Sequence, residues 1–293
     1  MAPPADRPGG LTNLQKRILS AAILLPLTVL AIAFGHPSFD LLVAVFAAIM
    51  AWEWARICAR RRQSENPSPA ARLPATGWLL PGAILIATSS VAVLSFGFAP
   101  AASKAGWLIV GVGAILSALA GARHHRSRAF WFSVGTVYVT LPAVALVAIR
   151  GEPTLGRETL FWIIALVVAA DTGGYLVGRS VGGPKLAPRI SPNKTWSGLG
   201  GAVAGAALAG ILTAFVLNHT NVWVLALISS GLGLVEQAGD LVESAFKRHF
   251  GVKDTSQIIP GHGGVLDRVD GLLAVAIAVL VLDEWAGGSV LAW

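Results

Sequence analysis

The stretch Thr159-Leu-Phe-Trp-Ile-Ile-Ala-Leu-Val-Val-Ala-Ala-Asp171-Thr-Gly-Gly-Tyr175-Leu-Val-Gly178 indicates the class of fold. It is long enough to cross a hydrocarbon core as a helix, which takes about 20 residues. Asp171 and Tyr175 are four residues apart, so they share one helix face. An acid inside a membrane span is costly unless it faces protein or water. The stretch therefore predicts a membrane helix with a functional end, although a buried acid paired with Arg179 or a neighbouring helix is the alternative.

Eight further apolar runs of similar length accompany this one. The chain has 293 residues, of which 55% are hydrophobic and only 13% are charged, and its mean hydropathy is +0.69. A soluble domain carries about a quarter charged residues. We therefore expect residues 1–293 to form a single integral membrane domain, an all-α polytopic fold with about nine transmembrane helices. The expected spans are 17–35, 38–58, 78–98, 104–121, 130–149, 159–178, 198–217, 222–243 and 270–286.

The basic residues are distributed very unevenly between the two sets of loops. With nine spans, one set of loops and ends carries 19 of the 22 lysines and arginines, and the other set carries three. The positive-inside rule then places the N-terminus, including a tail at 1–16, in the cytosol and the C-terminus on the outer side. The net charge of +7 fits anionic lipid headgroups, so we expect no nucleic-acid partner. The single cysteine, Cys58, excludes an intrachain disulfide.

Polar residues gather in the last third of the chain. Glu236, Asp240, Ser244 and Lys247 recur at steps of four, four and three, which makes one polar stripe on an apolar helix. Asp267 and Asp270 share a face at the start of the last span. Asp240 and Asp267 could share a divalent ion whose shell is completed by substrate phosphates, as is usual for Mg²⁺. The alternative for the stripe is an amphipathic helix end with solvated charges.

The loop at 182–196 is cationic and contains three prolines. Its lysines and hydroxyl groups suit a phosphate clamp, because charge-assisted hydrogen bonds hold phosphate oxygens. The residues concerned are Lys185, Ser191, Lys194 and Thr195. Cytosolic loops are basic in any case, so an ordinary topology signal is the alternative.

Several other features have plainer interpretations. Glu53 lies between two tryptophans and is expected to be an interfacial residue near Arg56. Gly201 and Gly205 form a GxxxG step, which lets helices approach closely, either within the subunit or at the seam of a homodimer. The stretch 63–74 is rich in Pro, Ser and Ala and is expected to be a flexible cytosolic linker.

Residues 244–270 fit a long pattern: S-x-x-K-R, four residues, K-D, and then P-x-H-G-G-x-x-D-R-x-D. The pattern begins at Ser244 and ends at Asp270, and it resembles the signature of the phosphatidate cytidylyltransferases. The resemblance extends over roughly residues 160–285, which are expected to be the catalytic part. Ser197 and Gly271 depart from what is common in that family, and neither position is an obvious ligand.

The resemblance implies that CTP and phosphatidate are converted to CDP-diacylglycerol and pyrophosphate with Mg²⁺, in phospholipid biosynthesis. It also implies a site at the cytosolic face of the bacterial inner membrane. Asp240 and Asp267 are expected to be metal ligands and, with Lys247 and Arg248, catalytic residues. Substrate-binding residues are expected to be Asp171, Tyr175, Lys185, Ser191, Lys194, Thr195, Ser244, Lys253, Asp254, His262, Gly263, Gly264, Arg268 and Asp270, of which Asp171 and Asp270 are also second candidates for metal ligands.

Two rival interpretations stay open at this point. Intramembrane carboxylates and glycines also mark the ion pathways of transporters. Transporters, however, need polar groups on a path that is open to both sides, whereas the polar residues here cluster at one face. A related cytidylyltransferase that acts on another lipid phosphate is the second rival.

Single cysteines can test the predicted topology. The loop containing Asn193 is predicted to be cytosolic, and Asn218 follows the next span. In a protein whose Cys58 is replaced, we expect cysteines at Asn193 and Asn218 to react with an impermeant thiol reagent from opposite sides of the membrane. Reaction of both from the same side would refute the nine-helix topology.

Overall fold

The computed structural model describes residues 13–59, 79–98, 103–122, 126–218 and 220–293, and this part of the chain contains the nine expected α-helices. A short antiparallel hairpin lies between the sixth and seventh helices, and a 3-10 turn lies near the C-terminus. The elements are α1 (Asn13–Phe34), α2 (Ser38–Ala59), α3 (Leu79–Phe98), α4 (Ser103–Ala122), α5 (Arg126–Arg150), α6 (Gly156–Ser180), β1 (Lys185–Ala187), β2 (Ser191–Thr195), α7 (Trp196–Leu217), α8 (Val222–His249), α9 (Leu266–Ala286) and η3 (Val290–Ala292).

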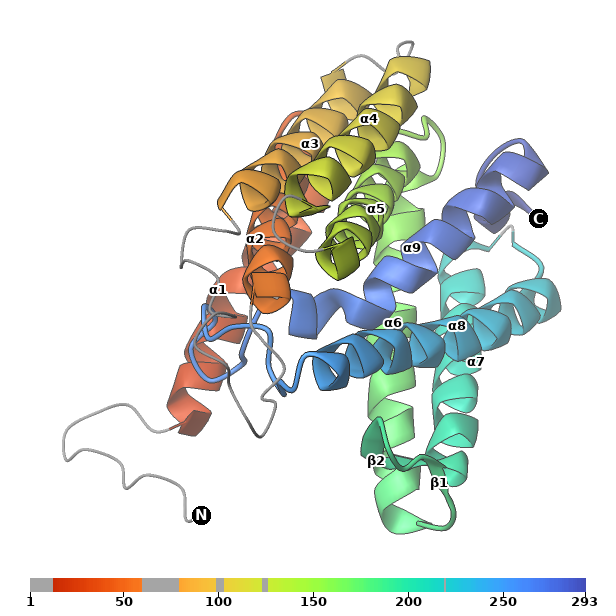
Figure 1. Ribbon diagram of the computed structural model, residues 1–293. Helices are drawn as coiled ribbons and strands as arrows, with labels where there is room; N and C mark the ends of the chain where they lie inside the picture. Colours follow the sequence, from red (N-terminus) through yellow and green to blue (C-terminus); the bar gives the residue numbers. More distant parts are fainter. Residues whose placement is uncertain (1–12, 60–78, 99–102, 123–125, 219) are drawn as a thin grey trace.

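The helices form two groups that α9 joins (Figure 1). Helices α2 to α5 pack together as one group, whereas α7 packs against both α6 and α8 in the other. Helix α9 contacts α5 on one side and α6 and α8 on the other. Helix α1 lies against α2 and touches α6. The start of α9, which carries Asp267 and Asp270, is thus held by elements from both halves of the chain.

Within the described ranges, five helices are long and apolar enough to cross a membrane: α2, α5, α6, α7 and α8. Shorter apolar segments lie in α1, α3 and α4, and charges at both ends of α9 confine its uncharged stretch to residues 271–282. Large apolar side chains such as Leu25, Val216 and Leu227 remain exposed, as expected for helices that face lipid. The membrane-protein interpretation is thus supported by length and composition, while the side on which each loop lies stays a prediction.

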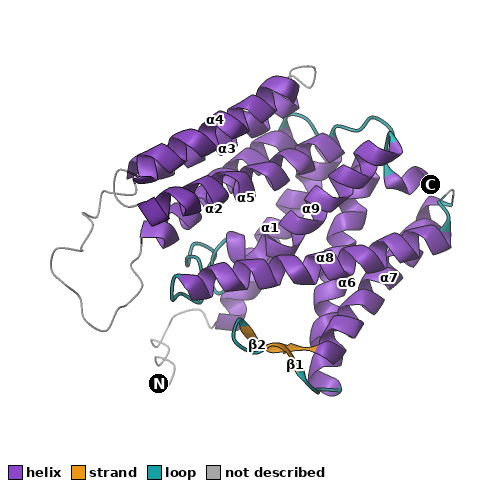
Figure 2. Ribbon diagram, turned by 45° about the vertical axis from the view of Figure 1, so that its right-hand side comes forward, coloured by secondary structure: helices purple, strands orange, loops and turns teal. Residues whose placement is uncertain are grey.

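The loop between α6 and α7 is more ordered than the sequence predicts. Its strands β1 and β2 pair antiparallel, with Lys185 opposite Thr195 (Figure 2). Gly183 has a φ of +106°, a left-handed conformation that glycine adopts without strain. The Thr195 hydroxyl accepts a hydrogen bond from the Gly198 amide at 3.1 Å, which caps α7. The loop predicted to hold phosphates is therefore a hairpin anchored to a helix end.

Glycines allow α6 and α7 to approach closely. A Cβ added at Gly201 would collide with the carbonyl oxygen of Gly173 and with the Val177 side chain. A Cβ added at Gly205 would collide with the carbonyl oxygen of Ala169. The GxxxG step therefore packs within the subunit, the first of the two alternatives, and it gives no support to a homodimer seam.

Two sequence expectations concern residues outside the described ranges. They are the cytosolic tail, most of whose residues lie before Asn13, and the linker at 63–74.

The glycine contacts make a direct prediction. Gly201→Ala places a methyl group against backbone, and such overpacking costs about 1–3 kcal/mol. We expect a lower Tm and a lower yield of folded protein in detergent. Gly200→Ala is the matched control, because nothing lies within 4 Å of a Cβ at that position. Equal Tm values for the two variants would contradict the packing.

Candidate functional site

The first part of the site joins the hairpin to α8. Lys194 of β2 forms an ion pair with Asp240 at 2.6 Å and donates a hydrogen bond to Gln237 Oε1 at 2.8 Å. The Gln237 amide donates to Glu236 Oε2 at 2.8 Å. Asp171 of α6 interacts electrostatically with both Glu236 and Lys194. One lysine and three acids, from β2, α6 and α8, therefore form one connected polar group.

A cavity of about 470 Å³ lies beside this polar group, between α6, α7 and the hairpin. Arg179 contributes to its wall and donates a hydrogen bond to the Tyr175 hydroxyl at 2.5 Å. Cations and hydroxyl groups around a cavity are suitable donors for phosphate oxygens. Five of the predicted substrate-binding residues line it: Asp171, Tyr175, Lys185, Lys194 and Thr195.

The second part of the site joins α8 to the start of α9. The Lys247 ammonium donates to Asp267 Oδ1 at 2.9 Å and also pairs with Glu243, one turn earlier on α8. Asp267 accepts two backbone hydrogen bonds, from the amides of Thr255 and Gly264, both at 2.9 Å. The side chains of Lys247 and Asp267 are only 11% and 5% exposed. These two predicted catalytic residues are together, as a buried ion pair.

The glycine-rich turn before α9 places Asp267 as the sequence suggests. Gly263 has a φ of +93°, and the Gly264 amide donates to Asp267. The His262 ring lies 2.7 Å from the Ser20 hydroxyl of α1, and the His262 carbonyl accepts a hydrogen bond from Arg268 at 2.8 Å. The turn is therefore tied to the first helix of the chain as well as to α9.

Other predicted residues have local partners. Arg248 donates to the carbonyl oxygens of Val252 at 3.0 Å and Ile190 at 3.3 Å, so it links the hairpin turn to the segment after α8. The Ser244 hydroxyl donates to Asp240 at 3.2 Å. The structure therefore places Arg248 against backbone and Ser244 against a predicted metal ligand.

Two predicted residues lie elsewhere around the site. Asp270 accepts a hydrogen bond from the Gly271 amide at 2.9 Å, and it interacts electrostatically with Asp240 and Lys247. Ser191 begins β2 and is not among the residues that line the 470 Å³ cavity.

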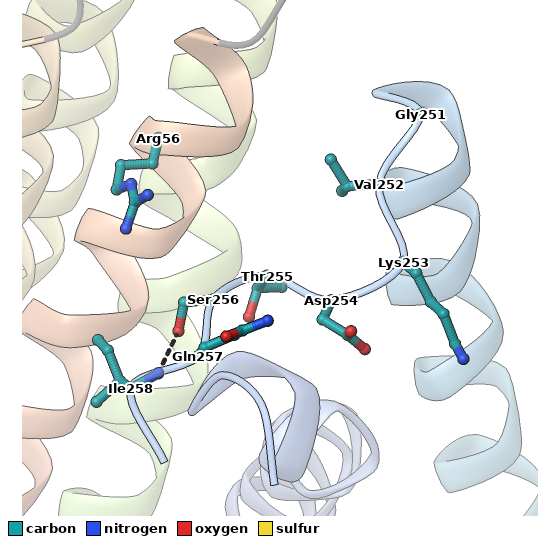
Figure 3. A pocket seen from close by; sticks show the side chains of 9 residues that line it. All are labelled: Arg56, Gly251, Val252, Lys253, Asp254, Thr255, Ser256, Gln257 and Ile258. Carbon is teal, nitrogen blue, oxygen red and sulfur yellow. Dashed lines mark hydrogen bonds between the residues drawn. The ribbon is translucent and has the colours of Figure 1, made fainter. Parts of the chain in front are cut away.

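A second cavity, of about 690 Å³, lies between the end of α2 and the segment 251–258. Figure 3 shows Arg56 extending from α2 toward this segment, while Lys253 points away from α2. Lys253 and Asp254 are the only predicted site residues in its wall. The smaller cavity is therefore the better candidate for the substrate, because more of the predicted chemistry surrounds it.

Two acids of the site escaped the sequence analysis. Glu243 is fully buried beside Lys247, and its i,i+4 spacing to that lysine was a usable signal. The expectation that Glu53 is an interfacial residue is wrong. Glu53 is also fully buried, and it accepts hydrogen bonds from a segment more than 200 residues away, which no local pattern could reveal.

The acids offer suitable donor atoms for Mg²⁺ but no complete cage. Within the described ranges, no three His, Cys, Asp or Glu side chains are grouped so as to hold a metal ion. Asp240 and Asp267 are each paired with a lysine. Mg²⁺ commonly binds one or two carboxylates and takes waters and substrate phosphates for the rest of its shell. The donor set therefore fits an ion that binds together with nucleotide phosphates.

Asp267 precedes the apolar part of α9 and retains its charge. Burial by itself would raise the pKa of the Asp267 carboxyl. The Lys247 ammonium and the amides of Gly264 and Thr255 outweigh burial and lower this pKa below its ordinary value. A group with a lowered pKa stabilises the folded state at pH values above its pKa in the unfolded chain. This contribution is lost as the pH falls through its pKa in the folded protein.

The pH dependence of stability tests this assignment. Asp267→Asn removes the charge with little change of shape. We expect the Tm difference between wild type and Asp267→Asn to stay constant from neutral pH to about pH 5 and to shrink only in more acidic buffer. Thermal unfolding in detergent across this range measures it. A difference that had already vanished near about pH 6 would show that the pKa of Asp267 is not lowered.

Comparison with known proteins supports the match found in the sequence. A phosphatidate cytidylyltransferase of Brucella suis biovar 1 is 36% identical over 266 residues, which cover 91% of this chain and 92% of the relative. The phosphatidate cytidylyltransferase of Mycobacterium leprae is 47% identical over 125 residues, which cover 43% of this chain and 40% of the relative. The sequence profile of the Cytidylyltransferase family matches residues 15–284. With a profile match over most of its length and a relative aligned along nearly the whole chain, this protein belongs to the Cytidylyltransferase family.

Proposed function

We propose that this chain is an integral membrane phosphatidate cytidylyltransferase, which converts CTP and phosphatidate to CDP-diacylglycerol and pyrophosphate. One observation carries the proposal. There are two lysine–carboxylate pairs, Lys194–Asp240 and Lys247–Asp267. One member of each pair, Asp240 and Lys247, lies on α8, and these two residues are two helical turns apart. One lysine comes from the hairpin, and one acid comes from α9. Full-length similarity to phosphatidate cytidylyltransferases supports the choice of substrates.

The position of the site suits a lipid substrate. Phosphatidate stays in the bilayer, whereas CTP is soluble, so the reacting phosphates must meet at the membrane surface. Asp171 and Asp240 lie in the second halves of the apolar helices α6 and α8, and the hairpin that carries Lys194 follows the end of α6. The charge distribution of the loops supports a cytosolic position for this end in a bacterial cell.

The reaction needs positioning more than proton transfer. A phosphate oxygen of phosphatidate attacks the α-phosphorus of CTP, a P–O bond forms, and pyrophosphate leaves with its bonding electrons. The nucleophile is already anionic, so no strong general base is required. Cationic side chains lower the barrier by holding the reacting groups in line and stabilising the charge on the leaving pyrophosphate.

The two lysines are suited to change partners when substrate binds. In the structure Lys194 and Lys247 neutralise Asp240 and Asp267. The phosphates of CTP would compete for these two ammonium groups, and Asp240 and Asp267 would then be the residues to hold Mg²⁺, which would neutralise phosphate charge. Lys185 and Arg179, in the wall of the 470 Å³ cavity, are positioned to hold the remaining phosphates. Lys253 and Arg248 are further candidates for the lipid headgroup.

A transporter is the alternative from another class. It would need a polar path to the other face, but the acids that α6 and α8 contribute to this site all lie in the second halves of these helices. Product formation by purified protein in detergent separates the two, because transport requires a second compartment. A cytidylyltransferase for a different lipid phosphate is distinguished by comparing lipid substrates in the same assay.

The two aspartates provide the decisive variants. We expect Asp240→Asn and Asp267→Asn to reduce CDP-diacylglycerol formation by at least about 100-fold. Each substitution removes a carboxylate charge beside the phosphates that react. Formation of product from labelled CTP and phosphatidate, with and without Mg²⁺, measures this. Near-normal turnover in both variants would remove the assignment.

The structure also decides the control for this experiment. Asp283, on the far end of α9, is expected from sequence to be silent on substitution, but it is buried and accepts a hydrogen bond from the Val290 amide at 2.9 Å. Glu284 is exposed at the same end. Glu284→Gln is therefore the better matched variant, with activity expected within about twofold of wild type.

A further inference from the structure

Glu53 is a buried acid on α2 that the reaction does not use directly. It lies near the C-terminal end of the helix, and its side chain is surrounded by the segment that leads into α9. A buried carboxylate is costly unless hydrogen bonds compensate for the loss of water. Its partners therefore indicate why an acid is tolerated there.

Both oxygens of the Glu53 carboxylate have two donors. Oε1 accepts hydrogen bonds from the Ser256 hydroxyl at 2.5 Å and from the Val265 amide at 3.0 Å. Oε2 accepts from the Leu266 amide at 2.8 Å, and the Thr255 hydroxyl lies 3.3 Å away. Two backbone amides and two hydroxyls thus bind one side chain from a distant helix.

The two amides belong to the first turn of α9. Val265 occupies the N-cap position, and its own side chain makes no capping hydrogen bond. Glu53 supplies the missing acceptor and also places a negative charge at the positive end of the helix dipole. The direction of the first turn of α9, which carries Asp267, is therefore fixed by α2.

Thr255 connects Glu53 to Asp267. Its hydroxyl lies 3.0 Å from Asp267 Oδ2 as well as 3.3 Å from Glu53, so one proton serves both carboxylates. Its amide donates to Asp267 at 2.9 Å. Figure 3 shows Thr255 and Ser256 on the short segment between α8 and α9.

Gly264 of the signature is also explained by this contact. A Cβ at Gly264 would lie 1.9 Å from the Thr255 hydroxyl oxygen and 2.6 Å from Glu53 Oε1. The glycine therefore leaves the space that the Thr255 hydroxyl and the Glu53 carboxylate occupy, so the three positions depend on one another.

We infer that Glu53 is a positioning residue for the cytidylyl transfer: it caps α9 and, with Thr255, aims the Asp267 carboxylate into the site. The inference depends on the proposed function only for the role of Asp267 in the reaction. It gives the first half of the chain a part in the reaction, through a contact that spans 202 residues.

The test is Glu53→Gln. Glutamine preserves the size, but one end of its amide is a donor, so the amide of Val265 or Leu266 must lose its acceptor. We expect kcat to fall about 10- to 100-fold, as for other small misplacements of a reacting group, with the KM for CTP changed by less than about threefold. We also expect half-maximal activity to require more Mg²⁺. Asp40→Asn is the control, since Asp40 is a buried acid at the other end of α2.

Hydrogen exchange separates positioning from general stability. In Glu53→Gln we expect faster exchange confined to residues 255–268, whereas in Asp40→Asn this segment exchanges as in wild type. A kcat within about twofold of wild type, or a loss of activity matched by loss of folded protein with unchanged exchange at 255–268, would overturn the inference. This readout needs no turnover, so it decides the role of Glu53 even if the proposed reaction were wrong.

A second variant covers the case in which Glu53→Gln does not fold. Thr255→Val removes the hydroxyl that faces both carboxylates and keeps the volume. We expect it to lower kcat at an unchanged KM for CTP. If Glu53→Gln folds, the kcat of the Glu53→Gln, Thr255→Val double variant should fall by less than the product of the two single-variant factors. The reason is that both substitutions act on Asp267. A kcat of Thr255→Val equal to that of the wild type would refute the inference.

Discussion

The ion pair between Lys247 and Asp267 is the interaction on which the site depends. Two charges buried at a membrane helix end are stable only when each has several partners, because removal from water is costly. Glu243 supplies a second acid for the lysine, and the amides of Thr255 and Gly264 supply donors for Asp267. The partners come from α8 and the segment after it, and Asp267 itself lies at the start of α9. The pair therefore requires all three to be in place.

Helix α9 is where the two halves of the protein meet. It packs against α5 on one side and against α6 and α8 on the other, so its first turn is held from both groups of helices. The aromatic contact between Trp54 of α2 and Phe246 of α8, with ring centres 3.7 Å apart, reinforces the same junction. The first half thus contributes to the site through packing and through Glu53, without contributing a signature motif.

Close approach of α6 and α7 has a comparable effect on the other side of the site. The glycines at their crossing bring the two backbones together, and the hairpin that connects them then reaches back over α8. Lys194 meets Asp240 as a result. The small residues of the α6–α7 crossing and the cation of the hairpin are therefore parts of one arrangement.

The sequence by itself predicted the nine helices of the described ranges, the apolar spans, the family and the candidate residues of the site, because hydrophobic runs, helical spacing and a signature motif are local properties. It could not determine the hairpin or the role of Glu53. Strand pairing and helix capping by a distant side chain depend on which groups meet in space. It also could not show that Asp240 and Asp267 are each paired with a different lysine. Only tertiary structure decides that, because ion pairing follows the distance between side chains rather than their spacing along the chain.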